Sequence, residues 1–221
     1  MKNRIIIIVV SSLMLSLVTP NLKGKEDFIR YRSHILMEKR IIKTEDIQGE
    51  NNSAKIMNFE VDSIIKRMNA DIHEIESIEN KKEWFIAYKE NINRYSNVLD
   101  TPETIYDYYT SKELDMLFRV VQAEVGDEYS FEQKINVASV IFNRIMHDDF
   151  ANEMQNILTS DQFQSISDGR YMEIKVSEET ILACEYSFMF RDKTNGCLFF
   201  DSNGKLNYEF VYSDGAHNFY R

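Results

Sequence analysis

The chain has 221 residues, a length that allows one or two domains. Hydrophobic residues make up 43% and prolines number two, a composition that excludes disordered and collagen-like chains. The formal net charge is −10, and residues 111–221 carry most of it, with 10 Lys and Arg against 19 Asp and Glu. Because phosphate contacts need a basic face, we expect no nucleic-acid binding.

The first 23 residues are typical of an export segment. Lys2 and Arg4 precede a short apolar run, residues 5–18. The run is short for a transmembrane helix, and "LVTPNLKG" contains no clear cleavage site. We therefore expect residues 1–23 to be a signal peptide or a membrane anchor, with a buried N-terminal strand as the structural alternative. Either form of export predicts an extracytoplasmic protein, secreted or tethered to the membrane through residues 5–18.

Residues 24–110 are charged and have a helical period. Hydrophobic residues step by three and four in two stripes. The stripes are Val61, Ile65, Met68, Ile72, Ile75 and Phe85, Tyr88, Ile92, Tyr95, Leu99. "ENKK", residues 79–82, lies between them, so the stripes could form a helical hairpin or pair with another chain. We interpret residues 24–110 as a helical stalk or linker that leaves self-association open.

Three further helices are predicted in residues 111–221, each from a capping residue. Ser111 is placed to cap the first helix. Ser130 and Gln133 form a capping box for a second helix that extends to about Met146. Ser177 precedes the third, "EETILACEYSFMF".

A β-hairpin is predicted to follow, in residues 197–213. Asn203 and Gly204 suit a tight turn, because both tolerate positive φ. Two cysteines lie in this half of the chain, Cys184 and Cys197. They could pair, but two thiols make no disulfide framework, and two small buried thiols are the structural alternative.

One apolar stripe contains carboxylates. Leu114, Leu117, Val121, Glu124 and Glu128 step by three and four along one side of the predicted first helix. Apolar surroundings and the negative end of the helix both favour the protonated carboxyl, which a general acid needs near neutral pH. The structural alternative is a polar residue where the stripe meets solvent, and Glu128 fits that description.

Other chemistries have weaker support. The sequence contains no HExxH, G-x-S-x-G or Walker pattern. Its histidines, which form no compact ligand pattern, are His34, His73, His147 and His217. We therefore expect no metal site and no cofactor. Ser-His-Asp catalysis and a Cys-His pair stay open, although both cysteines lie in apolar runs where thiols are usually inert.

Four motifs occur in a fixed order. They are "RVVQAEVGDE" (119–128), "VASVIFNRI" (137–145), "DQFQSISDGRY" (161–171) and "DGAHNFYR" (214–221). Together they resemble the SleB-type cell wall hydrolase family, which includes spore cortex-lytic enzymes, over residues 112–221. Residues 111–221 are therefore interpreted as a SleB-type catalytic domain.

The resemblance implies a lysozyme-like α+β fold, mainly helical with a small β-hairpin, that cleaves peptidoglycan with one essential glutamate. Glu124 stands at the position of that catalytic glutamate. The other positions that match the family's motifs are Glu128, Asn143, Arg144, Gln162, Phe163, Gly215, His217, Phe219 and Tyr220. The chain departs from the family at Gly126-Asp127, Tyr129 and Ala151, which puts loop shapes in doubt more than the chemistry.

Sugar contacts need polar hydrogen-bonding groups and aromatic faces. The candidates for these contacts are Gln162, Asp168, Tyr171 and His217. For Phe163, Phe219 and Tyr220 the alternative is core packing, and for Asn143 and Arg144 it is support of the helix.

The resulting hypothesis is a lytic transglycosylase that cleaves between MurNAc and GlcNAc and leaves 1,6-anhydro-MurNAc ends. A muramidase-type hydrolase, in which Glu128 or Asp168 assists water, is the nearest alternative. An N-acetylmuramoyl-L-alanine amidase and a non-catalytic wall-binding protein are the others.

Overall fold

The structure is a computed structural model. It describes residues 63–64, 66–67, 70–96, 103–190 and 194–221. Internal contacts divide the chain into the units Met1–Met57 and Asn58–Arg221, and all described residues belong to the second. The predicted export segment, residues 5–18, lies outside the described residues. Among the helices that are described, none is long and apolar enough to cross a membrane.

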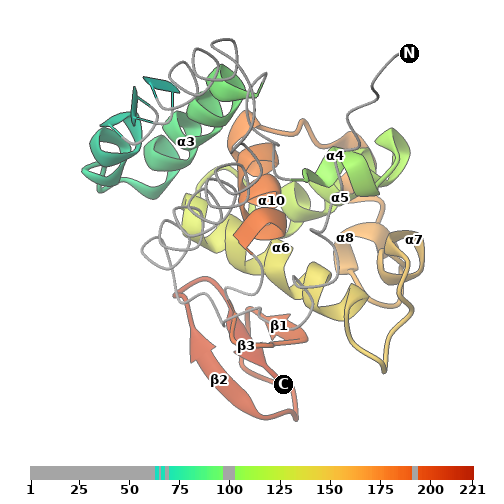
Figure 1. Cartoon of the computed structure of the whole chain (residues 1–221). Coiled ribbons are helices and arrows are strands. Elements are labelled where there is room, and N and C mark those ends of the chain that lie inside the picture. The colour runs from blue at the N-terminus through green and yellow to red at the C-terminus, as the bar shows by residue number, and fades with distance from the viewer. Residues whose placement is uncertain (1–62, 65, 68–69, 97–102, 191–193) are drawn as a thin grey trace, which may run out of the picture. The chain divides into compact units, whose positions relative to one another are not determined.

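Helices dominate the described chain, and a small sheet follows them (Figure 1). The helices are α3 (Lys81–Tyr95), α4 (Ile105–Tyr108), α5 (Ser111–Val125), α6 (Phe131–Ile145), α7 (Met154–Ile157), α8 (Gln164–Ser167), α9 (Arg170–Glu173) and α10 (Glu178–Phe190). The strands are β1 (Phe199–Asp201), β2 (Phe210–Ser213) and β3 (Asn218–Tyr220). The predicted α+β class, mainly helical with a small β element, is confirmed.

Capping side chains fix where the long helices begin. The Ser130–Gln133 capping box of α6 is confirmed, with the Ser130 side chain accepting from the Gln133 N–H. Ser177 Oγ accepts from the Thr180 N–H at the start of α10, as predicted. The prediction for α5 is wrong by one residue: Thr110 is its cap, because a capping box joins Thr110 to Glu113.

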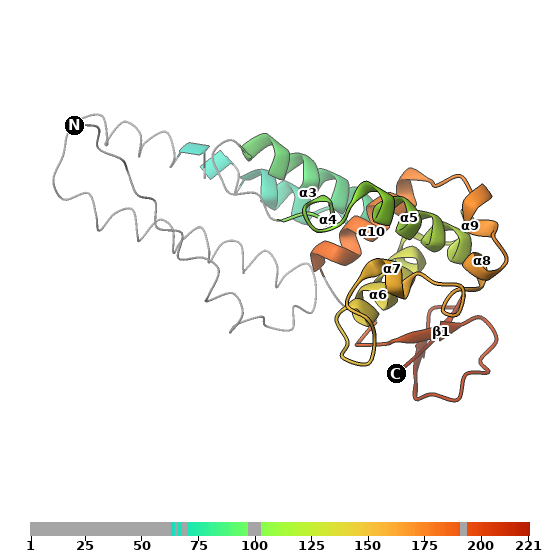
Figure 2. The same cartoon turned by 90° about the vertical axis from the view of Figure 1, so that its right-hand side faces the viewer.

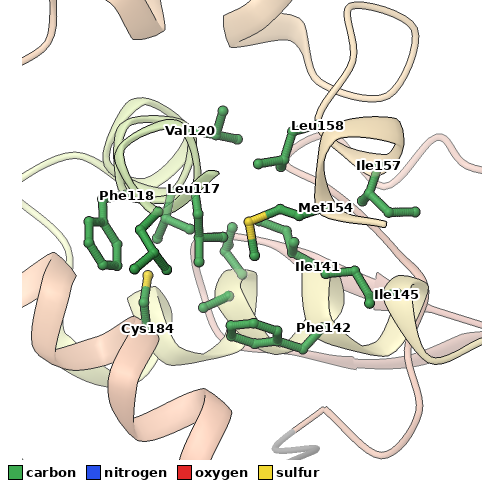
Figure 3. Packing of buried hydrophobic residues seen from close by; sticks show 14 of the residues in the cluster. Leu117, Phe118, Val120, Ile141, Phe142, Ile145, Met154, Ile157, Leu158 and Cys184 are labelled. Atoms are coloured by element: carbon green, nitrogen blue, oxygen red, sulfur yellow. The ribbon is translucent and has the colours of Figure 1, made fainter. Parts of the chain in front are cut away.

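The core lies between α5, α6, α7 and α10 (Figure 3). Leu117 of α5, Ile141 of α6 and Cys184 of α10 have no exposed surface, and Met154 of α7 is 1% exposed. The apolar stripe predicted for α5 is thus its buried face. At about 25 cal/mol per Å² of apolar surface, each such side chain contributes roughly 1.5–3 kcal/mol to folding.

The predicted hairpin in residues 197–213 is wrong. Strand order in the sheet is β1-β3-β2, so β1 and β2 both pair antiparallel with β3 and not with each other. Gly204 has the expected positive φ of 66°, but Asn203 does not share it. Instead, Asp201 accepts hydrogen bonds from the N–H groups of Gly204 and Lys205, which turns the chain away from β1.

Aromatic rings pack α3 against α10. Phe85 meets Tyr186 edge-on, with ring centroids 5.2 Å apart, and Trp84 lies 5.6 Å from Phe190. At the C-terminal end of α3, Asp71 accepts hydrogen bonds from Arg94 and from the Tyr95 hydroxyl. These two hydrogen bonds join the segment of the first stripe to α3, while Val61, Ile65, Met68 and Leu99 of the two stripes lie outside the described residues.

Ion pairs surround the aromatic contact between α3 and α10. Glu179 of α10 binds Lys82 of α3 through one carboxylate oxygen and Lys134 of α6 through the other, at 3.0 Å. Glu185 of α10 binds Lys89 of α3. The predicted division between residues 110 and 111 stays a prediction, and these contacts cross it. Self-association through the stalk also stays a prediction.

Candidate active site

Glu124 lies in the last turn of α5, half-buried. Its Oε1 accepts a hydrogen bond from the backbone N–H of Ser165, at 3.1 Å. Ser165 belongs to α8, and Figure 2 shows α8 and α9 beside one end of α5. The structure therefore places a fixed donor on one oxygen of the predicted catalytic carboxylate.

Glu128 does not lie on the stripe of α5, contrary to the prediction. Gly126 ends the helix with φ 80° and ψ 179°, a backbone conformation open almost exclusively to glycine. The Glu128 side chain folds back over this glycine, since a Cβ built on Gly126 would lie 2.5 Å from Glu128 Oε2. Glu128 is thus an exposed carboxylate just beyond the helix end.

His217 flanks Glu124 from the sheet side. Its ring is 7% exposed and lies 5.3 Å from the Phe200 ring and 6.2 Å from the Tyr129 ring. Burial lowers the pKa of His217, while the charges of Asp214 and Glu124 and the Glu124 backbone act in the opposite direction. His217 Nδ1 is buried without a hydrogen-bond partner. The chain therefore holds a buried imidazole with a lowered pKa close to Glu124.

Arg144 is buried next to three aromatic rings. Its guanidinium carbon lies 5.1 Å from the Phe163 ring centroid and 5.5 Å from those of Phe150 and Phe199. Nε donates to the Leu198 carbonyl at 2.6 Å. Burial lowers the pKa of Arg144 to about 10, so the side chain stays charged at neutral pH. This geometry is that of a structural support, the alternative that the sequence favoured.

Gln162 and Phe163 connect this arginine to α8. Gln162 is exposed, and its Oε1 accepts from Arg144 Nη1 at 3.2 Å. Phe163 is 2% exposed and belongs to the core, the alternative considered for it. Asn143 serves a different segment, because its amide donates to Thr194 Oγ1 and to the Cys197 carbonyl, both at 3.0 Å.

Asp168 directly follows α8 and Tyr171 lies in α9, and their surroundings differ. Asp168 is exposed and paired with Arg170 at 2.8 Å. A hydrogen bond from the Arg170 backbone is the main cause that lowers the pKa of Asp168. Arg170 in turn donates to the carbonyl of Ala123, next to Glu124. Tyr171 is partly buried against the core. Asp168 is therefore connected to the end of α5 through Arg170.

Tyr220 supports the sheet. It is 3% exposed, and its hydroxyl donates to Asp201 Oδ1 at 2.9 Å. Burial, and after it this hydrogen bond, raises the pKa of Tyr220. Phe219 has no exposed surface, as expected for core packing. Of the terminal motif, the structure thus brings His217 to Glu124 and uses these two aromatic residues for packing.

Sequence reasoning missed Ser165 and Gln122. Gln122 is 1% exposed, and its Oε1 accepts from the Ser177 hydroxyl at 2.9 Å and the Thr180 hydroxyl at 2.6 Å. It therefore joins the Glu124 helix to the start of α10. A glutamine inside "VVQAEV" is a detectable signal, since a buried amide needs partners. Ser165 gives no comparable signal, because its backbone N–H makes the contact.

Metal binding has no support in this part of the chain. Within the described ranges, no three His, Cys, Asp or Glu side chains come together in an arrangement that could hold a metal ion.

Residues 128–220 match the model of a family described as Cell Wall Hydrolase. Glu124 precedes that range by four residues. Two solved structures are similar to the chain at 19% identity. The catalytic domain of the germination-specific lytic transglycosylase SleB from Bacillus anthracis is matched over 53% of this chain and 100% of that one, with TM-score 0.47. The catalytic domain of the Bacillus cereus SleB protein is matched over 51% and 92%, with TM-score 0.46. No curated protein matches the chain.

Proposed function

Because residues 128–220 form a segment of the cell wall hydrolase family, we propose that the protein is an enzyme that cleaves the glycan strands of peptidoglycan between MurNAc and GlcNAc. The finer proposal is a lytic transglycosylase. The observation that carries it is the carboxylate of Glu124, held through one oxygen by the Ser165 N–H and flanked by the buried side chain of His217.

Glu124 acts as both acid and base in this proposal. Its protonated carboxyl gives the proton to the glycosidic oxygen, and the bond between that oxygen and C1 of MurNAc breaks. The sugar ring develops oxocarbenium character. The 6-hydroxyl of the same sugar then attacks C1, and the Glu124 carboxylate takes the hydroxyl proton. The product carries a 1,6-anhydro ring, and no water is consumed.

An intramolecular nucleophile makes a second catalytic carboxylate unnecessary. The exposed positions of Glu128 and Asp168 agree with this, because neither is packed against Glu124 in the described contacts. A hydrolase has one specific observation in its favour: Arg170 links Asp168 to the Ala123 carbonyl, next to Glu124, so this carboxylate could assist a water molecule. Asp168 would have to leave Arg170 to do so.

Peptidoglycan lies outside the cytoplasmic membrane, so this activity requires export. We propose that residues 1–23 supply it, as a cleaved signal or as an anchor. Fractionation of cells that express the full chain would place the protein in the medium, the membrane or the cytoplasm, and a cytoplasmic protein would contradict the proposal.

A digest of purified peptidoglycan tests the function. The full chain, E124Q and the control E132Q would each be incubated with sacculi, and the released muropeptides identified by mass spectrometry. E132Q is the matched control because Glu132 is an exposed glutamate at the start of α6. We expect anhydro-muropeptides from the parent and E132Q, and a loss of at least about 10³-fold in E124Q.

Other products would change the assignment. Reducing-end muropeptides would show that water attacks, and D168N and E128Q would then identify the second carboxylate. Release of free stem peptides would show an amidase. Glycan binding without any release would make the protein a wall-binding module, and equal activity of E124Q would remove Glu124 from the site.

A further inference from the structure

We propose that Arg144 and the segment Gln162–Ser165 position the catalytic carboxylate, with the Ser165 N–H as the group that orients Glu124. This inference rests on the proposed role of Glu124 as acid and base. Arg144 acts through this segment, and not by touching the glycan. It is therefore a positioning residue.

The contact to Glu124 comes from a rigid part of the chain. Ser165 has no exposed surface, so its N–H is shielded from water. A buried N–H needs an acceptor, and Glu124 Oε1 at 3.1 Å is the acceptor found. With Oε1 held in this way, Oε2 is left to exchange the proton with the sugar.

Phe163, two residues before Ser165, anchors the segment Gln162–Ser165 in the core. Its side chain is inserted in the core, and its N–H donates to the Thr159 carbonyl at 3.0 Å. The Phe163 carbonyl accepts from the N–H groups of Ile166 and Ser167, both at 3.1 Å. Ser165 therefore cannot shift without moving a buried aromatic ring.

Arg144 holds both Phe163 and its neighbour. The guanidinium packs 5.1 Å from the Phe163 ring, and Nη1 donates to Gln162 Oε1 at 3.2 Å. A planar guanidinium can stack on a ring and donate along its edge at the same time, which an ammonium cannot do. Arg144 donates to a side-chain amide oxygen and a backbone carbonyl, both uncharged. Its burial is therefore explained by its role in holding this segment and not by neutralisation of a carboxylate.

The same arginine also reaches the sheet. Nε donates to the Leu198 carbonyl at 2.6 Å, and the Leu198 N–H donates to the Tyr220 carbonyl at 2.9 Å. Tyr220 ends β3, the strand that begins directly after His217. One side chain thus fixes the two segments that flank Glu124, one carrying Ser165 and the other carrying His217.

Three variants separate positioning from binding. R144K keeps the charge but loses the contacts that the guanidinium makes to Phe163, Gln162 and Leu198. Q162A removes only the exposed one of these contacts, the hydrogen bond to Gln162. S165P removes the N–H itself but also places a proline after Gln164, a helical residue, whereas the control Q164P, one residue earlier, keeps this N–H. The backbone of Phe163, which precedes Gln164, is extended at φ −133° and ψ 124°, as a residue before proline should be.

We expect R144K to lower kcat by about 10–100-fold, since a displacement of about 1 Å at a catalytic group costs on the order of 10²-fold. KM for soluble glycan fragments should change by less than about threefold. Q162A should lower kcat less than R144K does, again at constant KM. S165P should lose at least about tenfold more activity than Q164P, and S165A, which keeps the N–H, should exceed S165P by at least about tenfold.

S139A is the stability control for R144K. Ser139 lies on the same helix, is buried, and shares a hydrogen bond of 2.8 Å with Ser187, away from Glu124. A fall in kcat for R144K but not for S139A at equal loss of thermal stability would support positioning, and equal falls in both would overturn it.

Other results would also overturn the inference. A rise in KM with unchanged kcat in Q162A would make Gln162 a sugar contact. Parental kcat in R144K and S165P, with E124Q inactive, would refute the positioning role and leave the proposed function intact. Parental activity of E124Q would refute both.

Discussion

His217 lies close to Glu124, where burial opposes the charged form of its ring. Its burial lowers the pKa from the ordinary value of 6.5, against the opposing influence of Asp214, Glu124 and Asp201. Between the lowered pKa and 6.5 the unfolded chain binds a proton that the folded chain does not. The free energy of unfolding must therefore decrease as the pH falls below 6.5.

This dependence predicts the behaviour of H217N. Urea unfolding of the parent between pH 8 and 5 should show a fall in unfolding free energy that begins near 6.5, and H217N should show a shallower fall. H147Q is the control, because His147 is exposed at a helix end and its removal should leave the slope unchanged. Identical slopes for H217N and the parent would mean that His217 titrates alike in both states.

The carboxylates of Glu113 and Asp107 affect the free energy of unfolding in a separate, lower pH range. Hydrogen bonds to Thr110 and Thr104 lower the pKa of Glu113 and of Asp107 at the caps of α5 and α4. Their contribution is present above the unfolded values of about 4 and is lost as the pH falls through the lowered folded values. A decline in the free energy of unfolding that starts near pH 6.5 therefore does not come from Glu113 or Asp107.

At the scale of elements, the carboxylate of Glu179 links α3, α6 and α10, and one of its two partners is a buried lysine. Lys134 of α6 is 1% exposed, and Glu179 of α10 is its carboxylate partner at 3.0 Å. Glu179 also binds Lys82 of α3, so a single carboxylate joins three helices. Removing it leaves a buried ammonium group without its counter-charge.

E179Q should therefore destabilise the protein by about 3–5 kcal/mol in urea unfolding, the usual cost of breaking a buried pair from one side. E132Q, which breaks the exposed pair with Lys81, should cost less than about 1 kcal/mol. The double variant K134M/E179Q should recover much of the loss, because no buried charge remains. A loss below about 1 kcal/mol for E179Q would mean that Lys134 finds another partner.

The long helices could be predicted from the sequence because local chemistry specifies them. The stripe from Leu114 to Val121 and the capping box at Ser130 act within a few residues, and the structure confirms both. The position of Glu124 at the end of the α5 stripe follows from the same pattern. The helical hairpin was one of two open alternatives, because an apolar stripe alone does not specify which surface packs against it.

The sheet and the Ser165 contact could not be predicted, since both depend on distant segments. β1 is three residues long and has its partner nearly twenty residues later, so no turn signal connects them. Ser165 reaches Glu124 through a backbone N–H, which every residue except proline has. The end of α5 was predictable in principle, because Gly126 is a helix terminator, but a continuous stripe was the stronger signal.

At the scale of the whole molecule, the two cysteines are not joined in a disulfide and occupy different clusters. Cys184 lies in the main core between the helices, and Cys197 packs with Val140 and Phe219 beside the sheet. Neither has exposed surface. Burial raises the pKa of the Cys184 thiol, so both burial and protonation protect it from reagents.

Thiol labelling should therefore report unfolding. We expect a thiol reagent to leave the native protein unmodified on a scale of minutes and to add two labels per chain in denaturant without a reductant, counted by intact mass. Rapid labelling of the native chain would contradict the burial of these residues. Failure to label in denaturant would show that Cys184 and Cys197 are joined.

The strand order has a consequence for how the protein is made. β3 is the last of the three strands to leave the ribosome, and both β1 and β2 pair with it. A nascent chain can already contain α5, with Glu124 on it, while the strand partners and His217 are still missing. Translation thus completes the helical layers first and the sheet side of the site afterwards. Until then, an unfinished chain carries Glu124, the proposed acid, without the sheet residues that flank it.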